Sequence, residues 1–176
     1  MKNRSKLFAL FACVALLSAV SLNALANRRA GDKEIDVQGA WDALKTLEGT
    51  WVANQPGPDG KNGEVVFKAT AGGSMLMETM FPGDKHEMIN TYHLDGERLL
   101  VTHYCAQGVQ PRMKLTGFDN GVIKFEFLDC TNMKPGEGHM GGLEISINGE
   151  QMVEKWSYLK DGKVAGETPF EFTKKN

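Results

Sequence analysis

Apolar and polar residues alternate in ten short runs between residue 50 and the C terminus, which is the pattern of β-strands with one buried and one exposed face. Gly follows Asp or Asn between many of these runs, and such pairs favour tight hairpins. The predicted strands cover 50–54, 64–70, 74–81, 87–94, 97–105, 112–118, 122–129, 143–147, 151–159 and 164–173. We therefore predict an all-β protein folded as an up-and-down antiparallel barrel of about ten strands, with a two-sheet sandwich as the alternative.

One short helix is predicted before the first strand. Asp36 can cap it, and apolar residues then recur at helical spacing: Val37, Ala40, Trp41, Leu44 and Leu47. Gly49 ends this pattern. Because the helix leads directly into the first strand, we expect its apolar face to close one end of the barrel.

The lengths of the connections distinguish the two ends of the predicted barrel. In a meander, alternate connections lie at alternate ends. The connections at one end are short, at 71–73, 95–96, 119–121 and 148–150, and those at the other are mostly long, at 55–63, 82–86, 106–111, 130–142 and 160–163. Long loops at the mouth of a scaffold commonly carry binding residues, so we expect a ligand to enter at this second end.

The first 26 residues have the three parts of a secretory signal peptide. Basic residues occupy 2–6, an unbroken apolar run covers 7–20, and Ala24-Leu25-Ala26 forms a small-x-small cleavage pattern. A membrane anchor helix is the alternative, but the run is shorter than the roughly 20 residues that span a bilayer. We expect a bacterial Sec-type export to the periplasm or the medium, without stable membrane insertion after cleavage. After the signal peptide we expect a flexible lead at 27–35 and a single barrel domain at 36–176.

Charge and motifs narrow the functional classes. The chain has 20 Lys and Arg against 22 Asp and Glu, a net charge of −2, which argues against nucleic acid as a partner. Gly-x-Ser-x-Gly, His-Glu-x-x-His and P-loop motifs are absent. We therefore assign no catalytic residue and no cofactor, and do not expect an enzyme.

The segment Leu47-Glu48-Gly49-Thr50-Trp51 resembles the Gly-x-Trp signature of lipocalins and the wider calycin superfamily. More of the chain, most of 36–174, is similar to a family of small exported bacterial calycin-like proteins of unknown function. The segments that carry this similarity are 77–81, 87–92, 102–105 and 110–113. The resemblance implies a barrel able to hold an apolar molecule, a Trp packed across its closed end and a Lys or Arg nearby, for which Lys174 or Lys175 could serve. It implies no established activity.

The Asp95-Gly96 turn predicts which side chains face the interior. If Leu94 lies opposite Glu97, then Met88 lies opposite His103, and the more apolar face of the hairpin carries Met88, Asn90, Tyr92 and His103. We place this face inside, with His103 near the mouth. Farther along the chain, Trp156 shares a strand face with Glu154. If that face is inside, Glu154 is a buried carboxylate with a raised pKa, suited to a general acid. If it is outside, Glu154 is a solvated surface residue.

Several polar residues are predicted to gather at the open end: His86, His103, Cys105, Gln110, Arg112, Asp129, Cys130 and His139. One interpretation is a polar collar in which Arg112 meets a ligand carboxylate or phosphate, while Tyr92 and Asn90 form hydrogen bonds deeper in the barrel. The alternative is a set of ordinary rim residues with a satisfied core histidine.

Two cysteines remain after the signal peptide, and an oxidising compartment favours a disulfide between Cys105 and Cys130. One predicted strand, 112–118, lies between the strands of the two cysteines. The loops that carry the cysteines must therefore curl inward to bring the two sulfur atoms within bonding distance. A soft metal site is the competing interpretation, with His103 and either His86 or His139 joining the two thiols. Because no C-x-x-C or H-x-x-x-H spacing supports it, we assign no metal.

The predicted function is the binding of a small, largely apolar or amphipathic molecule in the barrel. Phe and Met side chains, among them Phe67, Phe125, Phe127, Phe170 and Phe172, would line the interior. The expected ligand-binding residues are His103, Tyr92, Asn90, Met88, Arg112, Gln110 and Trp156. The alternatives are a structural or interaction domain, and a metal carrier or enzyme that uses the His103 and Cys105 cluster.

Overall fold

The structure, a computed structural model, describes residues 34–57 and 59–175. The predicted signal peptide at 1–26 and most of the predicted lead at 27–35 lie outside this part of the chain. None of the helices within it is long and apolar enough to cross a membrane.

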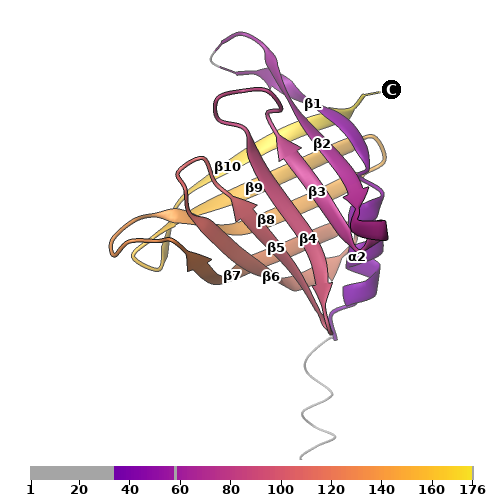
Figure 1. Ribbon diagram of the computed structural model, residues 1–176. Coiled ribbons are helices and arrows are strands. Elements are labelled where there is room, and N and C mark those ends of the chain that lie inside the picture. The colour runs from indigo at the N-terminus through magenta and orange to yellow at the C-terminus, as the bar shows by residue number, and fades with distance from the viewer. Residues whose placement is uncertain (1–33, 58, 176) are drawn as a thin grey trace, which may run out of the picture. The chain divides into compact units, whose positions relative to one another are not determined.

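Ten antiparallel strands close into a barrel in which neighbours in sequence are neighbours in space and β1 meets β10 (Figure 1). The prediction of an up-and-down barrel is confirmed, and the sandwich alternative is wrong. The strands are β1 Gly49–Pro56, β2 Asn62–Thr70, β3 Met75–Met80, β4 Met88–Asp95, β5 Arg98–Tyr104, β6 Gln110–Asp119, β7 Val122–Thr131, β8 His139–Asn148, β9 Gln151–Lys160 and β10 Lys163–Lys174.

Strand β8 begins four residues before its predicted start at residue 143. The reason is a β-bulge: the register against β9 shifts between Met140 and Gly142. A bulge breaks the alternation of inward and outward side chains, and glycines carry no side chain to reveal it. The start of this strand was therefore hidden from a pattern-based prediction.

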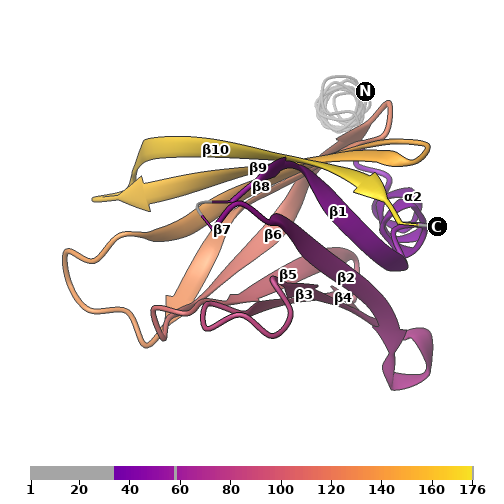
Figure 2. The ribbon, with the colours of Figure 1, turned by 90° about the horizontal axis from the view of Figure 1, so that it is seen from above.

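Helix α2, Val37–Lys45, lies at the end of the barrel that has the short hairpin turns, beside the end of β10 (Figure 2). Asp36 caps it as predicted, because its Oδ1 accepts a hydrogen bond from the backbone N–H of Gly39 at 2.8 Å. The helix buries Ala40, Trp41 and Leu44 and contacts β5 and β6. It therefore closes this end, as the sequence predicted.

Trp51 fixes the junction between helix and barrel. Its indole N–H donates to the backbone oxygen of Leu47 at 2.7 Å. Lys174 places its Nζ 5.4 Å from the centre of the Trp51 ring and donates to the oxygen of Thr46, the C-cap of α2, at 3.1 Å. Of the two lysines that the lipocalin resemblance suggested, Lys174 is the one beside the Trp.

The predicted register of the β4–β5 hairpin is wrong by two residues. Asn90, and not Met88, lies opposite His103, and Asp95 pairs with Arg98. The two turn residues are Gly96 and Glu97, and Gly96 takes φ 60°, as the first central residue of a type II′ turn requires. Because the error is an even number of residues, the predicted inward face is nevertheless correct.

Candidate functional site

A polar cluster lies inside the barrel, surrounded by apolar side chains. Glu78 on β3, Asn90 and Tyr92 on β4, and His103 on β5 form one wall of it, and Glu154 with Trp156 on β9 forms the opposite wall. None of these residues exposes more than 2% of its surface. They point inward because they occupy the same alternate positions as the buried Leu76, Met80 and Val101.

Hydrogen bonds join the residues of the first wall into a chain. The Asn90 side-chain amide and the Tyr92 hydroxyl both donate to Oε2 of Glu78 at 2.7 Å. Nδ1 of His103 lies 2.7 Å from Oδ1 of Asn90. On the opposite wall the Trp156 indole N–H donates to Oε2 of Glu154 at 3.2 Å, and its ring lies 5.1 Å from the His103 ring.

Glu78 and Glu154 face each other across the barrel, and each affects the ionisation of the other. Burial raises the pKa of Glu78 against the opposing effect of the hydrogen bonds from Asn90 and Tyr92. Burial and the charge of Glu78 raise the pKa of Glu154 well above its usual range. Oε1 of each carboxyl is buried without a hydrogen-bond partner. Of the two groups, Glu154 is the one whose protonated form is favoured both by burial and by the charge of its neighbour.

The same chain of hydrogen bonds fixes the protonation of His103. The amide nitrogen of Asn90 faces Glu78, so its carbonyl oxygen faces Nδ1 of His103 and can only accept. Nδ1 therefore carries a proton. Burial lowers the pKa of His103 to about 4, so the ring is neutral near pH 7 and Nε2 keeps a free lone pair.

Nε2 of His103 is buried without a hydrogen-bond partner. A buried acceptor left in this state costs about 1–3 kcal/mol. Such an atom is uncommon in a well-packed interior, where polar groups are almost always paired. Because it lies inside the barrel near the open end of β5, it is the strongest chemical feature of the site.

Four of the predicted ligand-binding residues, His103, Tyr92, Asn90 and Trp156, come together in this cluster. Met88 lies toward the open end, half-buried against the core. Glu78 was not among the predicted residues. A carboxylate flanked at alternate positions by the apolar Leu76 and Met80 is the signal that could have found it.

Arg112 and Gln110 lie outside the cluster. On β6 the buried positions are Pro111 and Met113, so the alternating residues point outward. Arg112 forms an ion pair with Asp129, with its Nε 2.6 Å from Oδ1, and the Gln110 side chain hydrogen-bonds to Gly108 and Thr131 at the open end. The collar expected around Arg112 is therefore separated from the interior by the barrel wall.

The other members of the expected collar are also dispersed. His86 is exposed beside Asp84, and His139 packs its ring 4.4 Å from that of Phe127. Cys105 and Cys130 are free thiols, and burial together with nearby charges, that of Cys105 included, raises the pKa of Cys130. Within residues 34–57 and 59–175, no group of three or more His, Cys, Asp or Glu side chains could hold a metal ion.

The open end is covered by aromatic and Met side chains. Phe81, Met88, Met140 and Phe170 are half-buried there and pack against the core. The Phe81 and Phe170 ring centres are 6.5 Å apart. Phe81 adopts φ 56°, a strained conformation for a bulky residue, and its ring lies directly against Gly63, where a Cβ would come within 3.0 Å.

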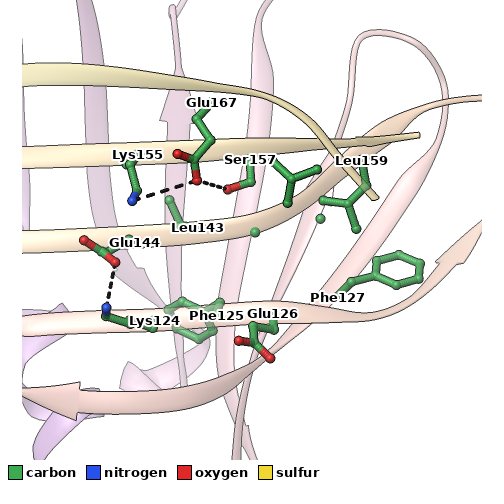
Figure 3. A pocket seen from close by; sticks show the side chains of 13 residues that line it. Lys124, Phe125, Glu126, Phe127, Leu143, Glu144, Lys155, Ser157, Leu159 and Glu167 are labelled. Atoms are coloured by element: carbon green, nitrogen blue, oxygen red, sulfur yellow. Dashed lines mark hydrogen bonds and ion pairs between the residues drawn. The ribbon is translucent and has the colours of Figure 1, made fainter. Parts of the chain in front are cut away.

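A hollow of about 490 Å³ lies on the outside of the barrel, over β7 to β10 (Figure 3). Its backbone includes Gly141 and Gly142, which leave space above the bulge of β8. Lys124 pairs with Glu144 at 3.0 Å and Lys155 with Glu167 at 3.9 Å along its edge. These four charged groups satisfy one another, in contrast to the unpartnered nitrogen of His103.

Comparison with known proteins gives no matching family model and no matching curated protein sequence.

Proposed function

We propose that this protein is exported and binds a small, largely apolar molecule inside its barrel, which the molecule enters from the end opposite α2. The observation that carries the proposal is the unpartnered Nε2 of His103, which is buried inside the barrel. A ligand that donates a hydrogen bond to this atom would remove the cost of leaving it unpaired. Binding sites of this kind are mostly apolar with a few placed polar groups.

The side chains of the open end support entry from that side. The interior toward α2 is filled by fully buried side chains such as Trp51 and Phe67. In contrast, Met88 and Met140 at the open end are only half-buried. Unbranched Met side chains change rotamer readily and fit varied apolar shapes. A ligand would therefore displace these side chains rather than the rigid closed end.

The proposal is tested with the apolar fluorophore N-phenyl-1-naphthylamine and the mature chain. We expect saturable binding that Met88→Trp weakens at least about tenfold, because the larger ring blocks the route to His103. Ser157→Trp is the matched control, since it fills the outer hollow over β7 to β10 and leaves the interior unchanged. Urea unfolding of both variants checks that each is folded.

Loss of binding in Ser157→Trp alone would assign the probe to the outer hollow and reject the proposal. Absence of saturable binding to the unmodified chain would reject it as well. It would then favour a structural or interaction domain, in which His103→Ala lowers stability and affects no ligand. Native mass spectrometry of the protein from its own compartment gives an independent readout, because a co-purified small molecule adds a defined mass.

A further inference from the structure

We infer that the polar end of the ligand is an uncharged hydrogen-bond donor on an aromatic ring, a phenolic hydroxyl or an aromatic N–H, which Nε2 of His103 accepts, and that the site rejects carboxylates. This inference rests on the proposed function. It specifies which chemical class the interior takes among the many apolar molecules that would fit by size.

The first support is the fixed direction of the hydrogen bonds. Glu78 accepts from Asn90, and Asn90 accepts from Nδ1 of His103, so each group along the chain has its role set by the one before. His103 cannot turn its proton toward the ligand without leaving the Asn90 oxygen unpaired. Nε2 can therefore only accept a hydrogen bond, and a ligand must supply the donor.

The second support is the charge of the interior. The buried polar and charged residues in the described part of the chain are Glu78, Asn90, His103, His139 and Glu154, with no Lys or Arg among them. Arg112, the cation that the sequence assigned to a ligand carboxylate or phosphate, lies on the outside and is paired with Asp129. A ligand carboxylate would enter beside two carboxyl groups without any cation to compensate it, which is costly in a buried site.

The third support is the aromatic surroundings. The Trp156 ring lies 5.1 Å from that of His103, and Phe81 and Phe170 meet at the open end. Aromatic rings pack against one another in tilted or offset arrangements, with a contribution beyond the area that they bury. A flat aromatic body with one donor group matches both the walls and the free lone pair.

The test compares three ligands of one shape: 1-naphthol, naphthalene and 1-naphthoate. Each is titrated against the mature chain, and the dissociation constants are measured by displacement of N-phenyl-1-naphthylamine. We expect 1-naphthol to bind about tenfold more tightly than naphthalene, because it adds one hydrogen bond to a group that is otherwise unpaired. We expect 1-naphthoate to bind more weakly than naphthalene.

His103→Phe keeps a ring at this position and removes the acceptor. In this variant 1-naphthol and naphthalene should bind equally. His93→Phe is the matched control, because His93 lies on the same strand as Asn90 but at an outward position, and it should keep the preference for 1-naphthol. If His103→Phe does not fold, the three-ligand series on the unmodified chain still decides the question.

The outcomes separate this inference from the proposed function. Equal binding of 1-naphthol and naphthalene, or tightest binding of 1-naphthoate, would overturn the ligand class and leave interior binding intact. Failure of all three ligands to bind would overturn both. Loss of the preference for 1-naphthol in His93→Phe as well as in His103→Phe would remove His103 from its role.

Discussion

At the scale of single residues, the interior of this barrel is unusual for the polar groups that it retains. The pKa values of Glu78 and Glu154 are raised, and His103 is held neutral with one lone pair free. Burial opposes the ionisation of all three, but it shifts the pKa of the carboxyls upward and that of the imidazole downward. The stability of the fold therefore depends on pH in two opposite ways.

His103 should make the fold sensitive to acid. Its pKa is about 6.5 when unfolded and about 4 when folded, so the unfolded chain takes up a proton first as the pH falls. The stabilisation is present above pH 6.5 and is lost between there and pH 4, to a total of about 3 kcal/mol. In His103→Gln, whose amide can still donate to Asn90, this loss should disappear. Urea unfolding across this pH range measures the difference, and parallel curves for the two proteins would refute the assignment.

Glu154 should act in the opposite direction. Its folded pKa lies above the unfolded one, so its contribution is present below about pH 4.3 and is lost as the pH rises through the folded value. The slope cannot exceed about 1.4 kcal/mol per pH unit for one proton. Glu154→Gln, whose amide can donate to Glu78 without titrating, should flatten this slope. The same unfolding series tests it, and an unchanged slope would show that the fold does not raise the pKa of Glu154.

At the scale of elements, the closed end depends on the contact between α2 and the last strand. Lys174 joins them, since it donates to the C-cap of the helix while its charge lies over the Trp51 ring. Cations near the end of a helix and above an aromatic face are both favourable. The junction thus links the two ends of the described chain into one structure.

Replacement of Lys174 by Met should lower the free energy of unfolding by about 1–2 kcal/mol, because the hydrogen bond and the cation–π contact are both lost. Lys175→Met is the control. The Lys175 side chain forms an exposed ion pair with Glu64, at 2.8 Å, and such pairs contribute less than about 1 kcal/mol. Chemical denaturation compares the two, and an equal loss in both would argue that Lys174 contributes no more than a surface charge.

At the scale of the whole molecule, export and the cysteines remain predictions. In an oxidising compartment Cys105 and Cys130 should form the disulfide expected from the sequence, and their free thiols in the structure leave this open. Thiol alkylation without reduction, followed by intact mass measurement, distinguishes the two states. Alkylation of both thiols in protein from the native compartment would reject the disulfide. The same measurement locates the N terminus, which we expect at Asn27.

Much of the architecture could be predicted because it depends on local sequence patterns. Alternation along each strand, Gly after Asp or Asn at the turns, and the helical spacing before Gly49 are each properties of adjacent residues. Ten strands and one helix follow from them. The start of β8 did not, because the bulge at Gly141 interrupts the alternation.

The candidate site could be predicted only in part. The inward positions of Asn90, Tyr92 and His103 followed from one hairpin, even though its register was wrong by two residues. The meeting of Glu78 with Glu154 did not follow, because these two residues belong to strands on opposite sides of the barrel. Arg112, grouped with the site by its place near the open end, points outward from β6 and pairs with Asp129.

The sequence by itself therefore determined the strands, the closing helix and the face that each β4–β5 residue presents, since these depend on neighbours along the chain. Only the tertiary structure decided that two carboxyls face each other across the barrel, that the pKa of Glu154 is raised there and that Nε2 of His103 is left without a partner. The physical reason is that burial and hydrogen bonding across a closed barrel depend on which distant strands face each other, and no local pattern records that pairing.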